Sequence, residues 1–247
     1  MNGTEHRVKR AILMAAGRGE RLRPLTEQTP KPLLRVRGVP MIESMIGALR
    51  RQGITEIHVV AGYRMEQFQY LADKYPGLSL VENPVYDRYN NISSLYAARE
   101  YLEDVLIADA DQIVEDDRAV APVYARSGYN AVWTAGSTKE WLLQLRDGIV
   151  TSCSRTGGSE GWQLYSISRW TAEDGRILRE RLEETYAREE NRQLYWDDVP
   201  LFCCPQDFRL GIYEMERQAV TEIDTLRELA MYDSQYAAFA AEGSAGK

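Results

Sequence analysis

The stretch LMAAGRGERLRPLTEQTPKPLL, residues 13–34, decides how we expect this chain to fold. It continues an apolar run, AILMAA at 11–16, which predicts a buried strand. Glycines and basic side chains follow that strand at once. Open parallel sheets bind ligands beyond the carboxyl ends of their strands, and the first loop is a favoured place. The order of strand, glycine and positive charge therefore predicts an anion-binding loop at the edge of a sheet.

Apolar runs and helical patterns alternate along the first half of the chain. Apolar residues at helical spacing between 42 and 49 predict a helix that stops at Gly53. The same patterns predict strands at 56–61, 78–82 and 105–109 and helices at 63–75 and 92–102. This alternation predicts right-handed βαβ units in a single α/β, Rossmann-like domain, with a mixed, mostly parallel central sheet flanked by helices.

In the second half, the sequence predicts mainly short strands, with two longer helices among and after them. Asp147 and Gly148 form a hairpin signal between two apolar runs. The patterns predict strands at 130–135, 140–145, 149–154, 162–168, 208–215 and 219–224, and helices at 171–190 and 225–241. We expect one domain over residues 1–247, with a mobile tail at 242–247.

Composition excludes several classes of protein. A net charge of −7 argues against nucleic acid as a partner, because a phosphate backbone demands a broad basic face. No apolar run approaches the roughly 20 residues that span a bilayer, so we expect no membrane insertion and a cytoplasmic protein. Neither His6 nor His58 suits acid–base work. The cysteines Cys153, Cys203 and Cys204 lack disulfide or zinc spacing, which predicts buried thiols.

The glycine and arginine loop has the chemistry of a phosphate cradle. Gly17 and Gly19 let backbone amides approach anionic oxygens, and Arg18, Arg21 and Lys31 add full charge. The spacing excludes a Walker loop, and Leu22 stands where a dinucleotide fingerprint needs its third glycine. Taken alone, the loop is explained equally well by glycines that form turns and arginines that lie at the surface, with no phosphate bound.

The whole combination, AAGRGERLRPL followed by TPKPL, resembles the signature of the sugar-nucleotide pyrophosphorylase superfamily. Further segments resemble its CTP:phosphocholine cytidylyltransferase branch, in the same order: Gly62-Tyr63, YNNISSLY at 89–96, Asp109-Ala110-Asp111, Glu140-Trp141, Tyr195-Trp196-Asp197 and Glu222-Ile223-Asp224. The resemblance implies a Mg²⁺-dependent enzyme that joins CTP and phosphocholine to give CDP-choline and pyrophosphate. It also implies a nucleotide-binding half at about 9–125 and an acceptor-binding half at about 126–230.

The resemblance assigns roles to individual residues. It implies catalytic roles for Lys31, Arg21 and Asp111, with Lys31 also meeting the acceptor, and a metal held by Asp111 and Asp224. Residues that match the family's nucleotide-binding positions are Ala15, Ala16, Gly17, Gly19, Arg21, Gly62, Asn91, Ser93, Ser94 and Asp109. From spacing alone, Asp224 is equally explained as the cap of a helix at Thr225, Asp109 as a buried structural carboxylate, and the Asn and Ser residues as turn residues.

Aromatic residues in the second half point to the acceptor. A quaternary ammonium donates no ordinary hydrogen bonds, so π faces and a nearby carboxylate hold it. Trp141, Tyr195 and Asp197 coincide with the choline-binding segments of the resembled branch, although aromatic residues in short strands more often belong to the core. The alternative acceptor 2-aminoethylphosphonate carries a primary amine, which a carboxylate serves as well as an aromatic box.

Other functions stay open at this point. The chain fits another transferase that joins a nucleoside triphosphate to a sugar phosphate. A metal-dependent glycosyltransferase would use Asp109 and Asp111, and a non-catalytic regulator would bind CTP without releasing pyrophosphate. In every case the partners are small molecules, and the chain acts as a monomer or homodimer.

Overall fold

The first strand of the central sheet is buried on both of its faces. In the computed structural model, which describes residues 5–240, β2 (Arg10–Ala15) sends Ala11, Leu13 and Ala15 into one apolar cluster and Ile12 and Met14 into another. Successive side chains of a strand point to opposite faces, so a continuous apolar run needs cover on both sides. This explains why the AILMAA run forms a central strand.

β2 lies within a parallel block. It pairs with β5 and β7, and β5 pairs with β6, all in parallel register. The strands are β5 (Glu56–Ala61), β6 (Leu78–Glu82) and β7 (Val105–Asp109). Their carboxyl ends meet at one edge, with Ala15 opposite Ala61 and Met14 opposite Asp109.

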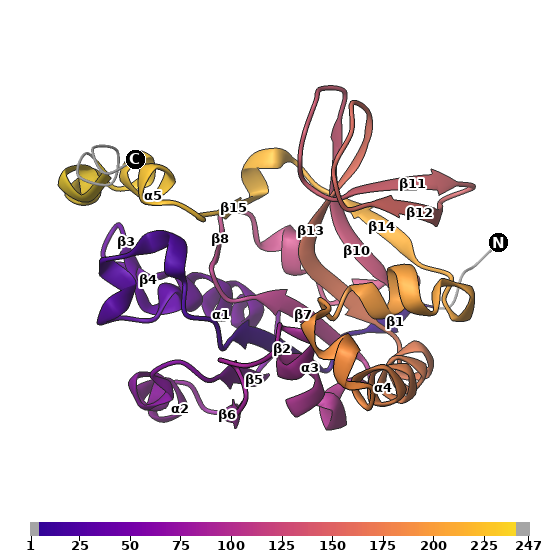
Figure 1. The fold of residues 1–247 in the computed structure, drawn as a ribbon, viewed down its shortest axis with the longest axis horizontal. Coiled ribbons are helices and arrows are strands. Elements are labelled where there is room, and N and C mark those ends of the chain that lie inside the picture. Colours follow the sequence, from indigo (N-terminus) through magenta and orange to yellow (C-terminus); the bar gives the residue numbers. More distant parts are fainter. Residues whose placement is uncertain (1–4, 241–247) are drawn as a thin grey trace.

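Helices cover the two faces of this block (Figure 1). Buried residues of α1 (Met41–Arg51) and α2 (Gln69–Lys74) join the cluster of Leu13. Buried residues of α3 (Ile92–Ala97) and α4 (Ala172–Tyr186) join the cluster of Ile12. The predicted α/β fold class is therefore confirmed.

The second half extends the sheet with mostly antiparallel strands. β13 (Gly161–Trp170) runs antiparallel to β7 and also pairs with β10 (Gly128–Thr134) and β11 (Leu142–Arg146). β11 forms a hairpin with β12 (Ile149–Ser154), turning at the predicted Asp147 and Gly148, and β14 (Gly211–Glu214) lies parallel to β10. The loops that join β10 to β11 and β12 to β13 rise above the sheet (Figure 1).

A small ribbon carries the C-terminal segment back to the edge of the sheet. β15 (Val220–Glu222) pairs antiparallel with β8 (Gln112–Val114), which directly follows the end of β7. α5 (Leu226–Tyr232) then begins and lies near the ribbon of β3 (Arg35–Val36) and β4 (Val39–Pro40) (Figure 1). A further short ribbon joins β1 (His6–Arg7) to β9 (Val123–Tyr124).

Several predicted helices are shorter than their patterns indicate. The helix predicted at 63–75 is a 3₁₀ turn, Met65–Phe68, followed by α2, because Arg64 adopts a left-handed backbone with φ 48°. Those predicted at 92–102 and 171–190 end in 3₁₀ turns after α3 and α4. The helix predicted at 225–241 is interrupted after Tyr232, where Asp233 is extended and its side chain accepts from Gln235 N, and helical structure returns at 237–240. The predicted tail at 242–247 lies outside the described residues.

The prediction of three buried thiols is wrong. Cys203 is exposed, and Cys153 and Cys204 are half-buried. Cys153 lies on β12, at one edge of the sheet, and the other two end the π-helical turn Val199–Cys203 at the surface. The lack of disulfide or zinc spacing indicated buried thiols, but these positions lie at a sheet edge or near the surface.

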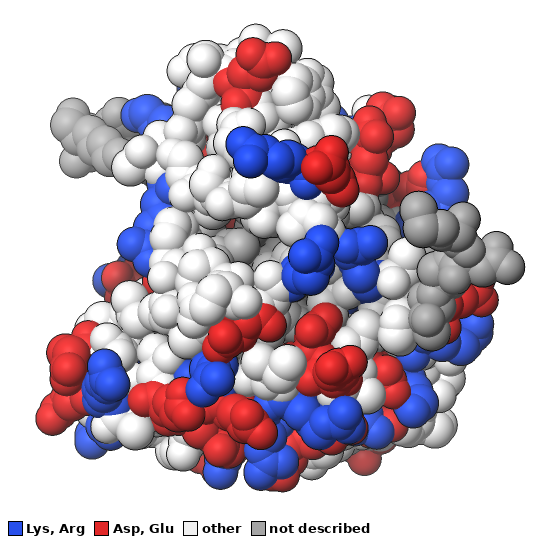
Figure 2. Space-filling model, turned by 90° about the vertical axis from the view of Figure 1, so that its right-hand side faces the viewer, with Lys and Arg blue, Asp and Glu red and all other residues white. Residues whose placement is uncertain are grey.

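The charged face of α4 is solvated, as its sequence predicts. Arg176 and Arg179 pair with Glu103 and Glu100, between α3 and β7, at 3.3 and 2.6 Å. Figure 2 shows acidic and basic side chains interspersed over the lower part of the face that lies at the right of Figure 1. Exposed pairs of this kind contribute little stability each. Within residues 5–240, no helix combines the length and apolar character that crossing a membrane requires.

We predict opposite effects for alanine at two helical glycines. Alanine normally stabilises a helix interior by up to about 1 kcal/mol over glycine. At Gly175 in α4, however, a Cβ would lie 1.9 Å from the carbonyl oxygen of Leu102, so Gly175→Ala should lower the free energy of unfolding by about 1–3 kcal/mol.

The matched control is Gly47→Ala in α1. There the nearest atom, at 3.1 Å, belongs to the flexible side chain of Arg51, so the variant should be neutral or more stable. Urea unfolding of both variants measures the difference. Equal changes would contradict the close packing of α4 on Leu102.

Candidate active site

The loop after β2 folds tightly around Gly19. Gly19 has φ 61°, and a Cβ there would lie 2.8 Å from the Cβ of Lys31. The hydroxyl of Thr26 donates to the carbonyl of Gly19 at 2.9 Å, which ties the two ends of the loop together. A side chain at position 19 would be strained and would displace Lys31, so glycine is required for this loop to close.

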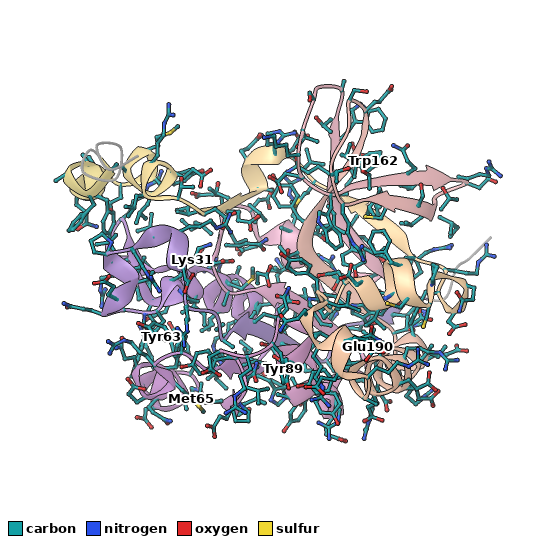
Figure 3. The ribbon with its side chains drawn as sticks, viewed as in Figure 1. Lys31, Tyr63, Met65, Tyr89, Trp162 and Glu190 are labelled. Carbon is teal, nitrogen blue, oxygen red and sulfur yellow. The ribbon has the colours of Figure 1, made fainter. Side chains whose placement is uncertain are left out.

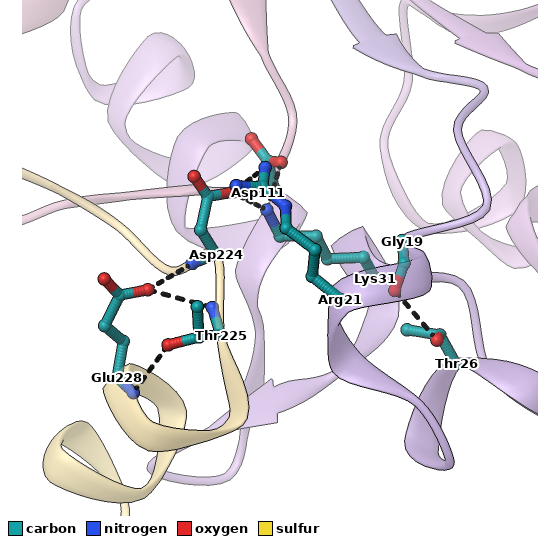
Figure 4. A network of polar contacts seen from close by, with 8 residues as sticks. All are labelled: Gly19, Arg21, Thr26, Lys31, Asp111, Asp224, Thr225 and Glu228. Carbon is teal, nitrogen blue, oxygen red and sulfur yellow. Dashed lines mark hydrogen bonds and ion pairs between the residues drawn. The ribbon is translucent and has the colours of Figure 1, made fainter. Parts of the chain in front are cut away.

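Lys31 lies at the centre of the site and contacts two carboxylates (Figure 4). Its Nζ is 2.6 Å from Oδ2 of Asp111 and 2.7 Å from Oδ1 of Asp224. Arg21 reaches the same oxygen of Asp224 at 2.8 Å, with a side chain that is mostly exposed. The structure thus brings together Arg21, Lys31, Asp111 and Asp224, which the sequence placed in one site.

Two local devices place Asp224. The β8–β15 pairing brings the segment after Glu222 beside the segment after β7. Thr225, rather than Asp224, caps α5: its hydroxyl accepts from Glu228 N at 3.2 Å, and Glu228 in return accepts from the amides of Asp224 and Thr225 at 2.8 Å (Figure 4). The capping alternative for Asp224 is therefore wrong, and its carboxylate is directed to Lys31.

The charges of the site are strongly coupled. Burial alone lowers the pKa of Lys31, but the charges of Asp111 and Asp224 outweigh this, so its pKa lies above the usual value and it stays an ammonium. Desolvation and the charge of Asp111 raise the pKa of Asp109. Partial desolvation and the charges of Asp111 and Asp224 likewise raise the pKa of Glu222. The cluster therefore carries more carboxylates than cations can balance.

Asp111 and Asp224 fit a divalent cation. Oδ1 of Asp111 is buried and has no hydrogen-bond partner among residues 5–240. Within those residues no group of three or more His, Cys, Asp or Glu side chains forms a ready metal site. Mg²⁺ is usually held by one or two carboxylates together with phosphate oxygens and water. The two aspartates have the chemistry of such a partial site.

Most of the predicted nucleotide-binding residues line one cavity of about 350 Å³ beside Lys31. Those that do are Ala15, Ala16, Gly17, Gly19, Arg21, Asn91, Ser94 and Asp109. Ser93 and Gly62 do not. The hydroxyl of Ser93 donates to Asn90 O at 2.8 Å, and a Cβ at Gly62 would lie 2.6 Å from the side chain of Tyr86. The contacts of both residues therefore lie outside the lining of this cavity.

Trp141 and Tyr195 contact each other, and neither they nor Asp197 line this cavity. The rings of Trp141 and Tyr195 meet edge to face with centroids 5.8 Å apart. Asp197 is buried, and the hydroxyl of Tyr129 lies close enough to its carboxyl for each group to shift the pKa of the other. Its charge contributes to the raised pKa of Asp109, so the two carboxyls are within electrostatic reach.

A second cavity, of about 480 Å³, adjoins the first at Asp224. Glu140 and Tyr165 line it, whereas Trp162 does not. Figure 3 places Lys31 on the N-terminal half of the fold and Trp162 well away from it on the upper strands. Trp162 packs against Trp133, at 5.2 Å between ring centroids.

Comparison with known proteins relates this geometry to a family. A model of the MobA-like NTP transferase domain matches residues 11–187. The chain belongs to the MobA-like NTP transferase family. The 2-aminoethylphosphonate cytidylyltransferase of Lancefieldella rimae is 39% identical over 238 residues, which are 96% of either chain. The choline-phosphate cytidylyltransferase of Streptococcus pneumoniae is 35% identical over 219 residues, 89% of this chain and 94% of that one.

A solved structure of the Streptococcus pneumoniae CTP:phosphocholine cytidylyltransferase has the same fold. Its TM-score is 0.83 at 34% identity, over 93% of this chain and 99% of that one. This MobA-like NTP transferase is therefore an enzyme that transfers a nucleotidyl group, and the two relatives described above are cytidylyltransferases. Family membership removes the regulator and the glycosyltransferase that the sequence left open.

Sequence reasoning missed two supports of the MobA-like site. Asn83 is almost fully buried, and its amide donates to the hydroxyls of Ser93 and Ser94 at 2.9 and 3.0 Å. Asn91 accepts from the backbone N of Trp196 at 2.9 Å, which joins the nucleotide side to the Tyr195 segment. A lone Asn directly after the strand at 78–82 was the available signal for the first. No sequence pattern near Asn91 indicates its contact with Trp196.

In this MobA-like fold, burial disfavours the ionised form of the Asp197 carboxyl. Burial raises the pKa of Asp197 to about 7, so the folded protein binds a proton that the unfolded chain has released. Stability should therefore fall as pH rises from about 4 to about 7. Asp197→Asn removes this loss, and above pH 7 the variant should gain a few kcal/mol of unfolding free energy, of the order of 4 at most.

Urea unfolding of wild type and Asp197→Asn at pH 5 and pH 8 measures this difference. The gain should be larger at pH 8. Asp73→Asn, at an exposed position on α2, is the control. An Asp197→Asn gain that is the same at both pH values would contradict the raised pKa.

Proposed function

We propose that this enzyme transfers the cytidylyl group of CTP to a small zwitterion with an anionic phosphorus group at one end and an amine at the other, and that 2-aminoethylphosphonate is the preferred acceptor. The buried carboxyl of Asp197, close to the hydroxyl of Tyr129 and two residues from Tyr195, carries the proposal. A primary ammonium donates hydrogen bonds to a carboxylate, whereas a trimethylammonium has no N–H. The 39% identity to a 2-aminoethylphosphonate enzyme supports the same acceptor.

Phosphocholine is the second candidate, which the sequence placed first. The aromatic cluster supports it, because Trp141 packs edge to face against both Tyr195 and Phe202, at 5.8 and 5.7 Å. Aromatic faces attract quaternary ammonium groups. The product would then be CDP-choline, as in the Streptococcus pneumoniae relative's named activity.

The proposed reaction is an in-line displacement at the α-phosphorus of CTP. An oxygen of the acceptor's phosphonate or phosphate bonds to that phosphorus while the bond to the bridging oxygen of the β-phosphate breaks, and pyrophosphate leaves. The attacking oxygen is already ionised, so no general base is required. His58 is accordingly not needed as a base: it is buried, its ring stacks on that of Tyr101 with centroids 3.6 Å apart, and it lines neither cavity.

Each residue of the Lys31 cluster has a proposed role. The backbone at Gly17 and Gly19 and the guanidinium of Arg21 hold the triphosphate. Asp111 and Asp224 would hold Mg²⁺, which supplies positive charge to the phosphates when bound. Lys31 stays charged, meets the incoming anion and neutralises the charge that builds up at the α-phosphorus.

The test of this function is pyrophosphate release from CTP, UTP, ATP or GTP, each combined with one acceptor. The acceptors are 2-aminoethylphosphonate, phosphocholine, phosphoethanolamine and hexose 1-phosphates. We expect turnover with CTP and the highest kcat/KM with 2-aminoethylphosphonate. A higher value with phosphocholine selects the second candidate, and turnover only with a hexose 1-phosphate would refute both.

Lys31→Ala separates binding from chemistry. It removes the ammonium from the reacting phosphates but leaves the Gly19 loop and Arg21, so CTP binding by calorimetry should persist. Turnover should fall by about 10²-fold or more, the usual effect of losing one transition-state donor. Lys74→Ala, at an exposed lysine paired with Glu43, is the control and should retain activity. Normal turnover by Lys31→Ala would refute its role.

A further inference from the structure

A cation of the protein already occupies the aromatic cluster beside the predicted acceptor residues. The Cζ atom of Arg155 lies 3.9 Å from the ring centroid of Phe202 and 5.8 Å from that of Trp141. Trp141 also meets Tyr195 edge to face. A guanidinium over an aromatic ring makes the same kind of interaction that a trimethylammonium would make. The two cations therefore compete for these rings.

Asp198 holds Arg155 in this position. Nε of Arg155 donates to Oδ1 of Asp198 at 2.9 Å, and a second guanidinium nitrogen contacts the same oxygen. The other carboxylate oxygen accepts from the backbone N of Tyr195 at 2.9 Å. Asp198 is only 2% exposed, so displacing Arg155 would leave a buried carboxylate without its cation. One carboxylate thus fixes both Arg155 and the segment that carries Tyr195 and Asp197.

Arg155 and Trp141 enter the cluster from two loops that are tied together. Arg155 follows β12, and Trp141 precedes β11. Backbone hydrogen bonds between Thr138 and Gly158, at 2.9 and 3.1 Å, join these loops. A Cβ at Gly157 would lie 1.9 Å from the carbonyl oxygen of Thr138, so the loops approach as closely as glycine allows. Arg155 is therefore positioned by the fold and not by its own rotamer alone.

We infer that Arg155 is a specificity-determining residue that excludes quaternary ammonium acceptors. Its guanidinium fills the faces of Phe202 and Trp141 and repels a second cation there. An acceptor with an N–H can still donate to a carboxylate such as Asp197, whereas a trimethylammonium, which has no N–H, depends on the aromatic faces that Arg155 covers. This inference rests on the proposed function, because it assumes that the acceptor carries an amine.

The test compares acceptors in Arg155→Gln and in the double variant Arg155→Gln with Asp198→Asn. The double variant leaves no unpaired buried carboxylate, so it keeps the test possible if the single variant does not fold. In both, the KM for phosphocholine should fall, and the ratio of kcat/KM for phosphocholine to that for 2-aminoethylphosphonate should rise by about tenfold. The kcat values should change little.

Arg99→Gln is the matched control. Its Cζ lies 4.2 Å from the ring of Tyr96, and its Nε is 3.1 Å from Glu183, so it loses a similar stacked and paired arginine outside the site. For this variant, the ratio of kcat/KM for phosphocholine to that for 2-aminoethylphosphonate should equal the wild-type ratio. Equal losses with both acceptors in the Arg155 variants would show a merely structural role and overturn the inference.

Calorimetric titration with phosphocholine gives a second readout that needs no turnover. Both Arg155 variants should bind phosphocholine about tenfold more tightly than wild type. Unchanged or weaker binding would overturn the inference. A wild type that turns over neither amine acceptor would refute the proposed function, and the binding comparison would still decide the role of Arg155.

Discussion

The contact of one buried ammonium with two carboxylates organises this protein. Lys31 comes from the loop after β2, Asp111 follows β7, and Asp224 follows β15, so three distant parts of the chain must meet within hydrogen-bond distance. The parallel pairing of β2 with β7 brings the first two to one edge. The β8–β15 ribbon and the capped start of α5 bring the third. Much of the remaining fold serves to hold these elements in register.

The same contact leaves the site with an excess of negative charge. Asp109 and Glu222 lie close enough to Asp111 for its charge to raise their pKa values, while Lys31 is the one buried cation among them. Gathering like charges in a partly desolvated space costs free energy. A ligand that brings a cation would relieve this cost and would stabilise the folded state as it binds. The cluster is therefore better suited to a bound complex than to the free protein.

Contiguous patterns predicted the edge of the sheet that carries the Gly19 loop and Asp111, and contacts between distant segments account for much of what they missed. The apolar run of β2, its glycine loop and Asp111 after β7 all follow from local sequence. Arg64, with its left-handed backbone, donates to Glu27 O, and Asp233, which follows Tyr232, accepts from the backbone N of Arg37, so contacts with distant segments help to set these helix boundaries. The contacts of Asn91 with Trp196 and of Arg155 with Asp198 join residues 105 and 43 positions apart, so no local pattern indicates them.

The Gly19 loop and the proposed acceptor side also differ in how well they tolerate amino-acid substitutions. The Gly19 loop depends on backbone conformation and close approach, so most substitutions there would disturb the whole cluster around Lys31. The proposed acceptor side is built from side chains on the loops beside β11 and β12 and on the segment after α4, and there the guanidinium of Arg155 lies over the rings of Trp141 and Phe202. Replacing that one side chain changes the charge offered to an acceptor without altering any group that handles the triphosphate. Under the proposed function, acceptor choice is therefore physically separable from nucleotidyl transfer, which accounts for relatives of similar sequence that are named for different acceptors.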